Sequence, residues 1–156
     1  METIRNVRSG DTWSLEGEVY FGLFETYIGF GVEDSASIEY VGSCATYLNS
    51  MSDALIDHLC EASIRYCNDF LDRIGEPQKT FSMPREVLGL ITPICLLVPN
   101  PEHGEEPVIH LELNCKWEVE HGLEWVARRG SALYVGPFNG EHPWADYSQK
   151  DEWNYA

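Results

Sequence analysis

The sequence predicts an α+β domain, in which an antiparallel sheet of about six strands packs with one face against two helices. Apolar and polar residues alternate within 19–32 and again within 109–135, which is the period of a strand with one buried face. Between these segments, residues 38–74 repeat apolar positions every three or four residues, as amphipathic helices do. With 156 residues, 44% of them apolar, the chain can bury one core, so we expect residues 1–156 to form a single domain.

The first part of the sheet is an N-terminal hairpin. Residues 1–17 are mixed, and we expect an irregular lead-in or an edge strand at Thr12–Leu15. Apolar residues then alternate on either side of a turn at Glu25-Thr26. Glycines at positions 22, 29 and 31 have the opposite parity, which indicates that other backbone approaches the second face closely, or that the strands bend.

Two helices follow the hairpin. Glu33-Asp34-Ser35 supplies candidate N-caps for the first, whose predicted inward residues are Ile38, Val41, Cys44, Ala45 and Leu48. The second extends from about Asp53 to Ile74, with an apolar stripe along its whole length. Gly75 and Pro77 end it in the usual order.

The C-terminal half supplies the meander. We expect a short helix at Pro84–Leu90, a strand at Thr92–Val98 and a solvated loop at Pro99–Pro107. From Ile109 to Val119 the odd positions are apolar and the even ones polar, so the even face is expected to be exposed to solvent. The breaks at 120–122 and 129–130 are too short to join parallel strands, so three antiparallel strands are predicted.

The charge of the chain is its most informative bulk property. It has 26 acidic and 10 basic residues, a net charge of -16 and a pI near 4.5. Such a surface repels nucleic acid and anionic membranes and attracts a basic protein. Acidity that serves only solubility is the alternative.

The expected cellular compartment is inferred from targeting and membrane-spanning segments that we do not find in the sequence. No apolar run approaches the roughly 20 residues of a membrane span, and the first residues have no apolar core of a signal peptide. The five cysteines are odd in number and form no CxxC, which favours reduced thiols over disulfides or a structural zinc site. We therefore expect a cytoplasmic protein with no membrane partner.

Catalytic chemistry has little support in the sequence. Glu118, Glu120 and His121, with His110 further away, offer metal-ligand types, but the spacing favours a turn with a hydrogen-bonded histidine. Cys60 and His58 diverge on a helix and cannot form a dyad. There is no GxSxG, P-loop or dinucleotide motif. We expect no enzyme, no catalytic residue, no metal and no cofactor.

A binding surface of acids and aromatic residues is the preferred hypothesis, since tryptophan and tyrosine anchor protein interfaces. The aromatic residues after Gly136 either fold back onto the body, which we expect, or present an exposed surface. The residues predicted to contact a partner are Asp57, Glu61, Glu102, Glu105, Glu106, Trp144, Asp146, Tyr147, Asp151, Glu152 and Trp153.

The segment CKWEVEHGLEWVARRGSALYVG, residues 115–136, resembles a signature of small acidic bacterial proteins classed as domains of unknown function. That signature is a tryptophan, an acid, any residue and Glu-His-Gly-Leu, followed by a strand and a late glycine. The matching residues are Trp117, Glu118, Glu120, His121, Gly122, Leu123 and Gly136. The chain departs from it at Glu124, where the signature has a second glycine. The order of hairpin, helix pair, Leu90–Pro93 and meander is similar too, so the resemblance covers most of the chain.

Such families resemble, in size and acidity, the immunity proteins that neutralise polymorphic or contact-dependent toxins. The resemblance implies a toxin inhibitor that binds a cognate, basic toxin domain as one member of a toxin–antitoxin pair, and it brings no established catalytic residues. Two alternatives stay open. One is a small metal-binding protein or enzyme that uses the Glu120-His121 turn, and the other is an uncharacterised domain that is acidic only for solubility. The oligomeric state is undetermined.

Overall fold

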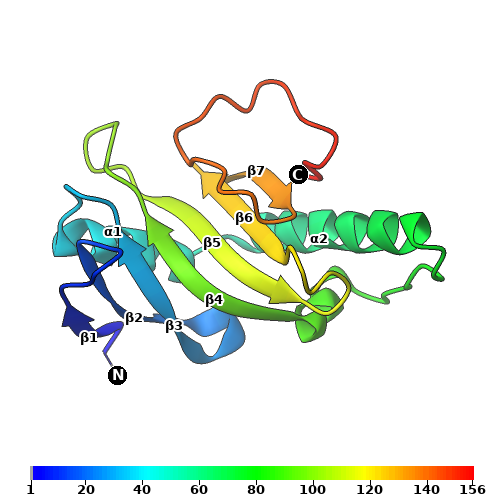
Figure 1. Cartoon of the computed structure of the whole chain (residues 1–156), viewed down its shortest axis with the longest axis horizontal. Coiled ribbons are helices and arrows are strands. Elements are labelled where there is room, and N and C mark those ends of the chain that lie inside the picture. Colours follow the sequence, from blue (N-terminus) through cyan, green and yellow to red (C-terminus); the bar gives the residue numbers. More distant parts are fainter. Residues whose placement is uncertain (1) are drawn as a thin grey trace.

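A computed structural model describes residues 2–156 and contains one sheet of seven strands. Their order in the sheet is their order in the chain: β1 (Ile4–Arg8), β2 (Leu15–Phe21), β3 (Thr26–Val32), β4 (Ile91–Val98), β5 (Val108–Cys115), β6 (Leu123–Arg128) and β7 (Ser131–Gly136). Figure 1 shows both long helices on one side of this sheet. The predicted α+β class, with an N-terminal hairpin, a C-terminal meander and helices on one face, is confirmed.

One junction in the sheet is parallel. All neighbouring strands are antiparallel except β3 and β4, where Gly29 pairs with Cys95 and Val32 with Val98. A parallel neighbour requires a long crossover connection, and here it consists of α1 (Ile38–Asn49), α2 (Asp53–Arg73) and the 3₁₀ helix η2 (Pro84–Leu90). A shorter 3₁₀ helix, η1 (Gly22–Phe24), joins β2 to β3. Alternation within each strand does not reveal this junction, because it carries no information about the direction of a distant neighbour.

The N-terminal edge differs from the prediction. The edge strand is β1, and Thr12–Leu15 forms the approach to β2. Trp13 lies over β3 at Gly31, where a Cβ would come within 2.6 Å of the indole ring. The close approach of other backbone predicted at the glycines of this hairpin is therefore wrong at Gly31, where a side chain takes that space.

Both helices begin at serine caps. The side chain of Ser37 accepts a hydrogen bond from the Tyr40 N–H at 3.1 Å, so the expected cap at 33–35 is corrected by two residues. Ser52 caps α2 in the same way through the Leu55 N–H. Ile74 was expected in the core but is 54% exposed, because α2 ends at Arg73. No helix within residues 2–156 combines the length and the apolar character needed to cross a bilayer.

The core lies between the helices and the odd-numbered face of the meander. Ile109, Leu111 and Leu113 of β5 are almost completely buried, and burial of each such side chain contributes about 1.5–3 kcal/mol. The buried indole N–H of Trp125 donates to Ser63 Oγ of α2 at 3.0 Å. This bond satisfies two polar groups that would otherwise be costly inside the core.

The strand predicted up to Val119 is shorter than its alternation suggested. β5 ends at Cys115, and Val119 is 86% exposed in the turn that follows. Trp117 remains buried because the turn folds it against α2, where its ring meets Tyr66 edge-on with centroids 5.6 Å apart. The alternation of apolar and polar residues thus continues in the sequence after the strand has ended, whereas the burial does not.

The second face of the sheet is partly covered, which corrects the expectation that it is exposed. His110 is 7% exposed and Glu124 is completely buried. The cover is the C-terminal segment, defined as residues 137–156, which crosses the face and arches back to the edge of β7 (Figure 1). There the Tyr155 N–H donates to Val135 O at 2.8 Å. The predicted folding back of the late aromatic residues is confirmed for Trp144, Tyr147 and Tyr155, whereas Trp153 stays 43% exposed.

Candidate functional site

Residues 117–122 form a turn fixed between β5 and β6. Gly122 has φ +67°, and its N–H donates to Glu118 O at 3.0 Å. A Cβ at this position would lie 2.8 Å from the carbonyl oxygen of Leu113, so the turn requires glycine both for its dihedral angle and for its space. The Tyr66 hydroxyl of α2 donates to Gly122 O at 2.9 Å. The turn is therefore held rigidly against the helix.

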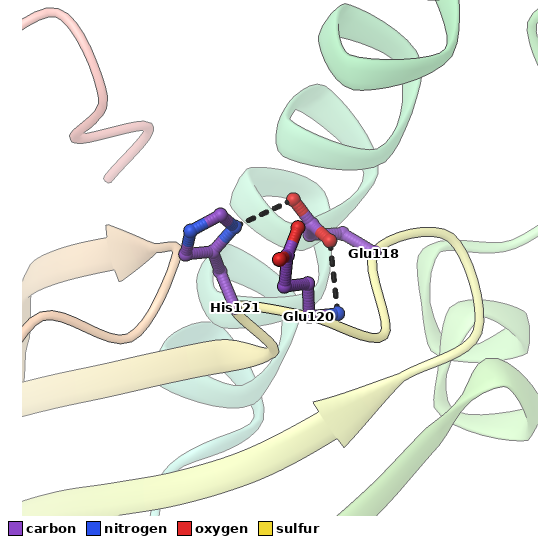
Figure 2. A group of neighbouring side chains, drawn as sticks. All are labelled: Glu118, Glu120 and His121. Atoms are coloured by element: carbon purple, nitrogen blue, oxygen red, sulfur yellow. Dashed lines mark hydrogen bonds and ion pairs between the residues drawn. The ribbon is translucent and has the colours of Figure 1, made fainter.

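Glu118 and His121 form a hydrogen-bonded ion pair within this turn. Glu118 Oε2 lies 2.9 Å from His121 Nδ1, and Glu118 Oε1 accepts the Glu120 N–H at 3.0 Å (Figure 2). Burial favours a higher pKa for Glu118, but the hydrogen bonds from His121 and from the backbone outweigh it and lower that pKa. The bond to Glu118, followed by that carboxylate's charge, raises the pKa of His121.

This turn also has the composition of a small metal site. One ligand atom from each of Glu118, Glu120 and His121 lies within 4.8 Å of the other two. Figure 2 shows the carboxylates of Glu118 and Glu120 on the same side of the turn as the imidazole. An imidazole with two carboxylates suits a divalent transition-metal ion, and the exposure of Glu120 and His121 would leave further positions for water.

The acids predicted on α2 lie at one end of β4. Arg85 of η2 binds Asp57 at 3.0 Å and Asp53 at 2.8 Å, so Asp57 already has a cationic partner. Glu61 is exposed one turn further along α2. η2 leads directly into β4, whereas the loop at 99–107 follows the other end of that strand. The structure thus places the predicted α2 acids and the predicted loop acids at opposite ends of β4.

The loop acids lie beside the C-terminal segment. Glu102 and Glu105 are exposed, while Glu106 binds Arg129 at 2.6 Å. The hydrogen bond from Arg129 lowers the pKa of Glu106. The indole N–H of Trp144 donates to Asn100 O at 2.8 Å, and its ring meets that of His103 edge-on. This contact joins the loop to the C-terminal segment.

The remaining predicted contact residues have mixed roles. Tyr147 is half-buried and donates to His142 O at 2.8 Å, while Asp146 accepts the Ser148 N–H at 2.9 Å, so both help to shape the C-terminal segment. Asp151, Glu152 and Trp153 are exposed on its last part. The predicted set is therefore divided over α2, the loop with Trp144, and the end of the chain.

A buried polar pair on the second face was missed at the sequence level. His110 Nε2 lies 2.5 Å from Glu124 Oε2. The two Glu124 carboxylate oxygens also accept the backbone N–H groups of Asn139 and Glu141, at 3.0 and 2.9 Å. A signal was present, because Glu124 lies inside the apolar run Leu123–Ala127 and an aromatic segment follows. The alternation of apolar and polar residues, used alone, placed both side chains on the face of the sheet that was expected to be exposed to solvent.

Comparison with known proteins identifies the family. A family model described as a domain of unknown function, DUF6985, matches residues 3–143. No curated protein and no solved structure matches the chain. The match covers the sheet, both helices and the start of the C-terminal segment. The chain therefore belongs to this family of domains of unknown function.

Proposed function

We propose that the protein is a non-enzymatic binding protein, and specifically a bacterial immunity protein that captures and neutralises a basic cognate toxin domain in the cytoplasm. The observation that carries this proposal is the net charge of -16. Such a charge accelerates encounter with a positively charged protein and disfavours nucleic acid and anionic membranes as partners. The proposal assigns no catalytic residue and no cofactor.

The arrangement of acids around α1 supports this proposal. Glu39 of α1 and Glu105 of the loop line an open groove of about 720 Å³, together with the half-buried Tyr47. Glu102 lies in the same loop, whose Asn100 carbonyl accepts the Trp144 N–H. Acids beside fixed aromatic side chains suit lysine and arginine side chains of a partner, because charge steers the encounter and aromatic surface anchors the contact.

The test is co-expression with the product of the gene directly upstream, which the proposal expects to end in a toxin domain. We expect growth rescue and a 1:1 complex whose Kd rises about tenfold or more between low and physiological salt. The double variant E39Q/E105Q should weaken binding about three- to tenfold. The matched control D72N/E76Q removes the same charge from exposed positions at the end of α2 and should have little effect. Absence of a complex at low salt, with both proteins folded, would refute the proposal.

A second candidate function is binding of a divalent cation at the turn of Glu118, Glu120 and His121. The 4.8 Å grouping of their ligand atoms favours it. Titration with ZnCl₂ in a calorimeter should then give one stoichiometric site that His121→Ala abolishes. His58→Ala, which removes an exposed histidine from α2, is the control and should leave that site intact. If neither a partner nor a metal binds, acidity for solubility alone is the surviving alternative.

A further inference from the structure

A cavity of about 380 Å³ lies on the sheet face opposite the helices. Its volume is within the range of small-molecule sites, about 300–1,000 Å³. Five separate parts of the chain supply its walls, and these lining residues are Trp13, Glu33, Leu97, Val98, Pro99, His110, Glu112, Phe138 and Gly140. The cavity is distinct from the acidic groove on α1 and from the turn at 118–121.

The buried wall of the cavity contains His110, which forms a hydrogen bond through only one of its two ring nitrogens. Both oxygens of Glu124 accept backbone N–H groups, so the short contact at 2.5 Å is assigned to the Nε2–H of His110 donating to Glu124. The other ring nitrogen, Nδ1, has no hydrogen-bond partner among residues 2–156. The ring is held parallel to Phe138 with centroids 6.3 Å apart. A histidine that is 7% exposed thus lines the cavity with one ring nitrogen unpaired, and in the neutral imidazole with Nε2 protonated this nitrogen is an acceptor.

The charge of the cavity is negative and lacks compensation. Glu112 lies directly opposite Glu124 in the β5–β6 ladder, and both side chains are on the same face. Like charges in such directly opposed positions destabilise a sheet. Glu33 is the second carboxylate in the lining, and its Oε1 lies 3.7 Å from His142 Nε2. None of the lining residues is a lysine or an arginine.

The rest of the lining is apolar and aromatic. Leu97, Val98 and Pro99 form one wall at the end of β4, and Trp13 and Phe138 contribute rings. Aliphatic walls suit a hydrocarbon stem, while aromatic rings and carboxylates both attract a cationic head. An anion would meet the carboxylates of Glu33 and Glu112 and no lysine or arginine, and a neutral apolar ligand would leave Nδ1 of His110 unpaired.

We propose that this cavity binds a cationic nitrogen group on a short aliphatic stem, an ammonium or guanidinium. His110 Nδ1 accepts a hydrogen bond from the group, and Glu33 and Glu112 supply the counter-charge. The site goes beyond the proposed function, since a free amine and a lysine or arginine side chain of a protein partner share this chemistry. Glu124 acts as a positioning residue, because it fixes the ring of His110 without facing the ligand.

Agmatine, which carries a guanidinium at one end of a four-carbon stem and an ammonium at the other, is the probe for the direct test. We expect saturable binding by calorimetry, with pentanol and pentanoate at least tenfold weaker. Amide resonances of His110, Glu112 and Phe138 should shift with the same saturation curve, while those of α2 stay unchanged. Agmatine that binds no better than pentanol, or shifts that spread evenly over the surface, would overturn the proposal.

Glu112→Gln separates a ligand site from a structural effect. It removes one charge with almost no change in shape, so agmatine affinity should fall at least tenfold. The same change relieves the repulsion from Glu124, so the melting temperature of the ligand-free protein should stay the same or rise. Glu76→Gln, at an exposed acid just beyond the end of α2, is the matched control and should alter neither quantity. Equal agmatine affinity in Glu112→Gln and wild type would contradict the proposal.

Competition identifies the source of the cation. If agmatine displaces the basic partner, the cavity takes a side chain of that partner. If agmatine and the partner bind together, the natural ligand is a free amine. Failure to find any partner would remove the proposed function and leave the agmatine result standing, whereas partner binding without agmatine binding would remove only the cavity site.

Discussion

Glu124 is the residue whose loss should most directly expose how the second face is built. Its side chain is completely buried and accepts three hydrogen bonds, from His110, Asn139 and Glu141. Glu124→Ala would leave all three donors without a partner. Breaking a buried polar network of this kind costs about 3–5 kcal/mol. For a chain of this length, that loss corresponds to a fall in the melting temperature of about 8–16 °C.

Glu124→Gln should be milder. An amide oxygen still accepts one backbone N–H, and the amide NH₂ can donate to His110 if the imidazole changes tautomer. One backbone donor then loses its acceptor, at a cost of about 1–3 kcal/mol. The number of hydrogen bonds that residue 124 can accept therefore predicts that stability falls in the order wild type, Glu124→Gln, Glu124→Ala. Glu112→Gln, on the facing strand, is the control and should lose no stability.

The assay is urea unfolding followed by circular dichroism, combined with amide hydrogen exchange. Exchange at Asn139 and Glu141 should accelerate in Glu124→Ala even under native conditions, because the C-terminal segment loses its contact with the sheet. A stability loss under about 1 kcal/mol for Glu124→Ala would refute the reasoning, since an unsatisfied buried network cannot cost so little. Unchanged exchange at both amides would refute the role of Glu124 in holding the segment.

Three further predictions concern the turn and the cysteines. Gly122→Ala should destabilise by about 2–4 kcal/mol in urea unfolding, because it combines a positive φ with a clash at Leu113 O, whereas Gly75→Ala, with φ +77° and open space, should cost only about 1 kcal/mol. The pair Glu118–His121 should stabilise the protein most between pH 4.5 and 6.5, the ordinary pKa values of the two groups. The pKa of Glu118 is lowered in the folded protein, so its contribution to stability is lost as the pH falls through that folded value. The pKa of His121 is raised, so its contribution is lost as the pH rises through that folded value. Melting temperatures of wild type and His121→Asn should therefore differ most in that window, and a constant difference from pH 4 to 8 would contradict the assignment. Burial raises the pKa of Cys60, Cys95 and Cys115 to about 12. A thiol reagent at pH 8 should therefore label the native protein slowly, whereas it should label all five cysteines quickly in urea. Rapid labelling of the native protein would contradict this prediction, because it would show that these thiols are accessible.

Local periodicity determined much of the fold. Three-four spacing located α2 to within one residue at its C-terminal end, because the apolar stripe and the stop at Gly75 are both local signals. Alternation located β5 and β6 and assigned Ile109, Leu111 and Leu113 to the core. The Glu120-His121-Gly122 turn was recognisable from its glycine, and the predicted hydrogen-bonded histidine is confirmed in the contact with Glu118.

Tertiary structure alone decided what lies on the second face of the sheet. Parity says that His110, Glu112 and Glu124 share a face, but it cannot say whether a distant segment covers that face. The cover comes from the C-terminal segment, whose turn-rich composition carries no periodic signal, and the hydrogen bonds to Glu124 arise only once it is in place. The parallel pairing of β3 with β4 could not be predicted for the same reason. Both features depend on contacts between parts of the chain that are far apart in sequence, and a local pattern of apolar residues contains no information about such contacts.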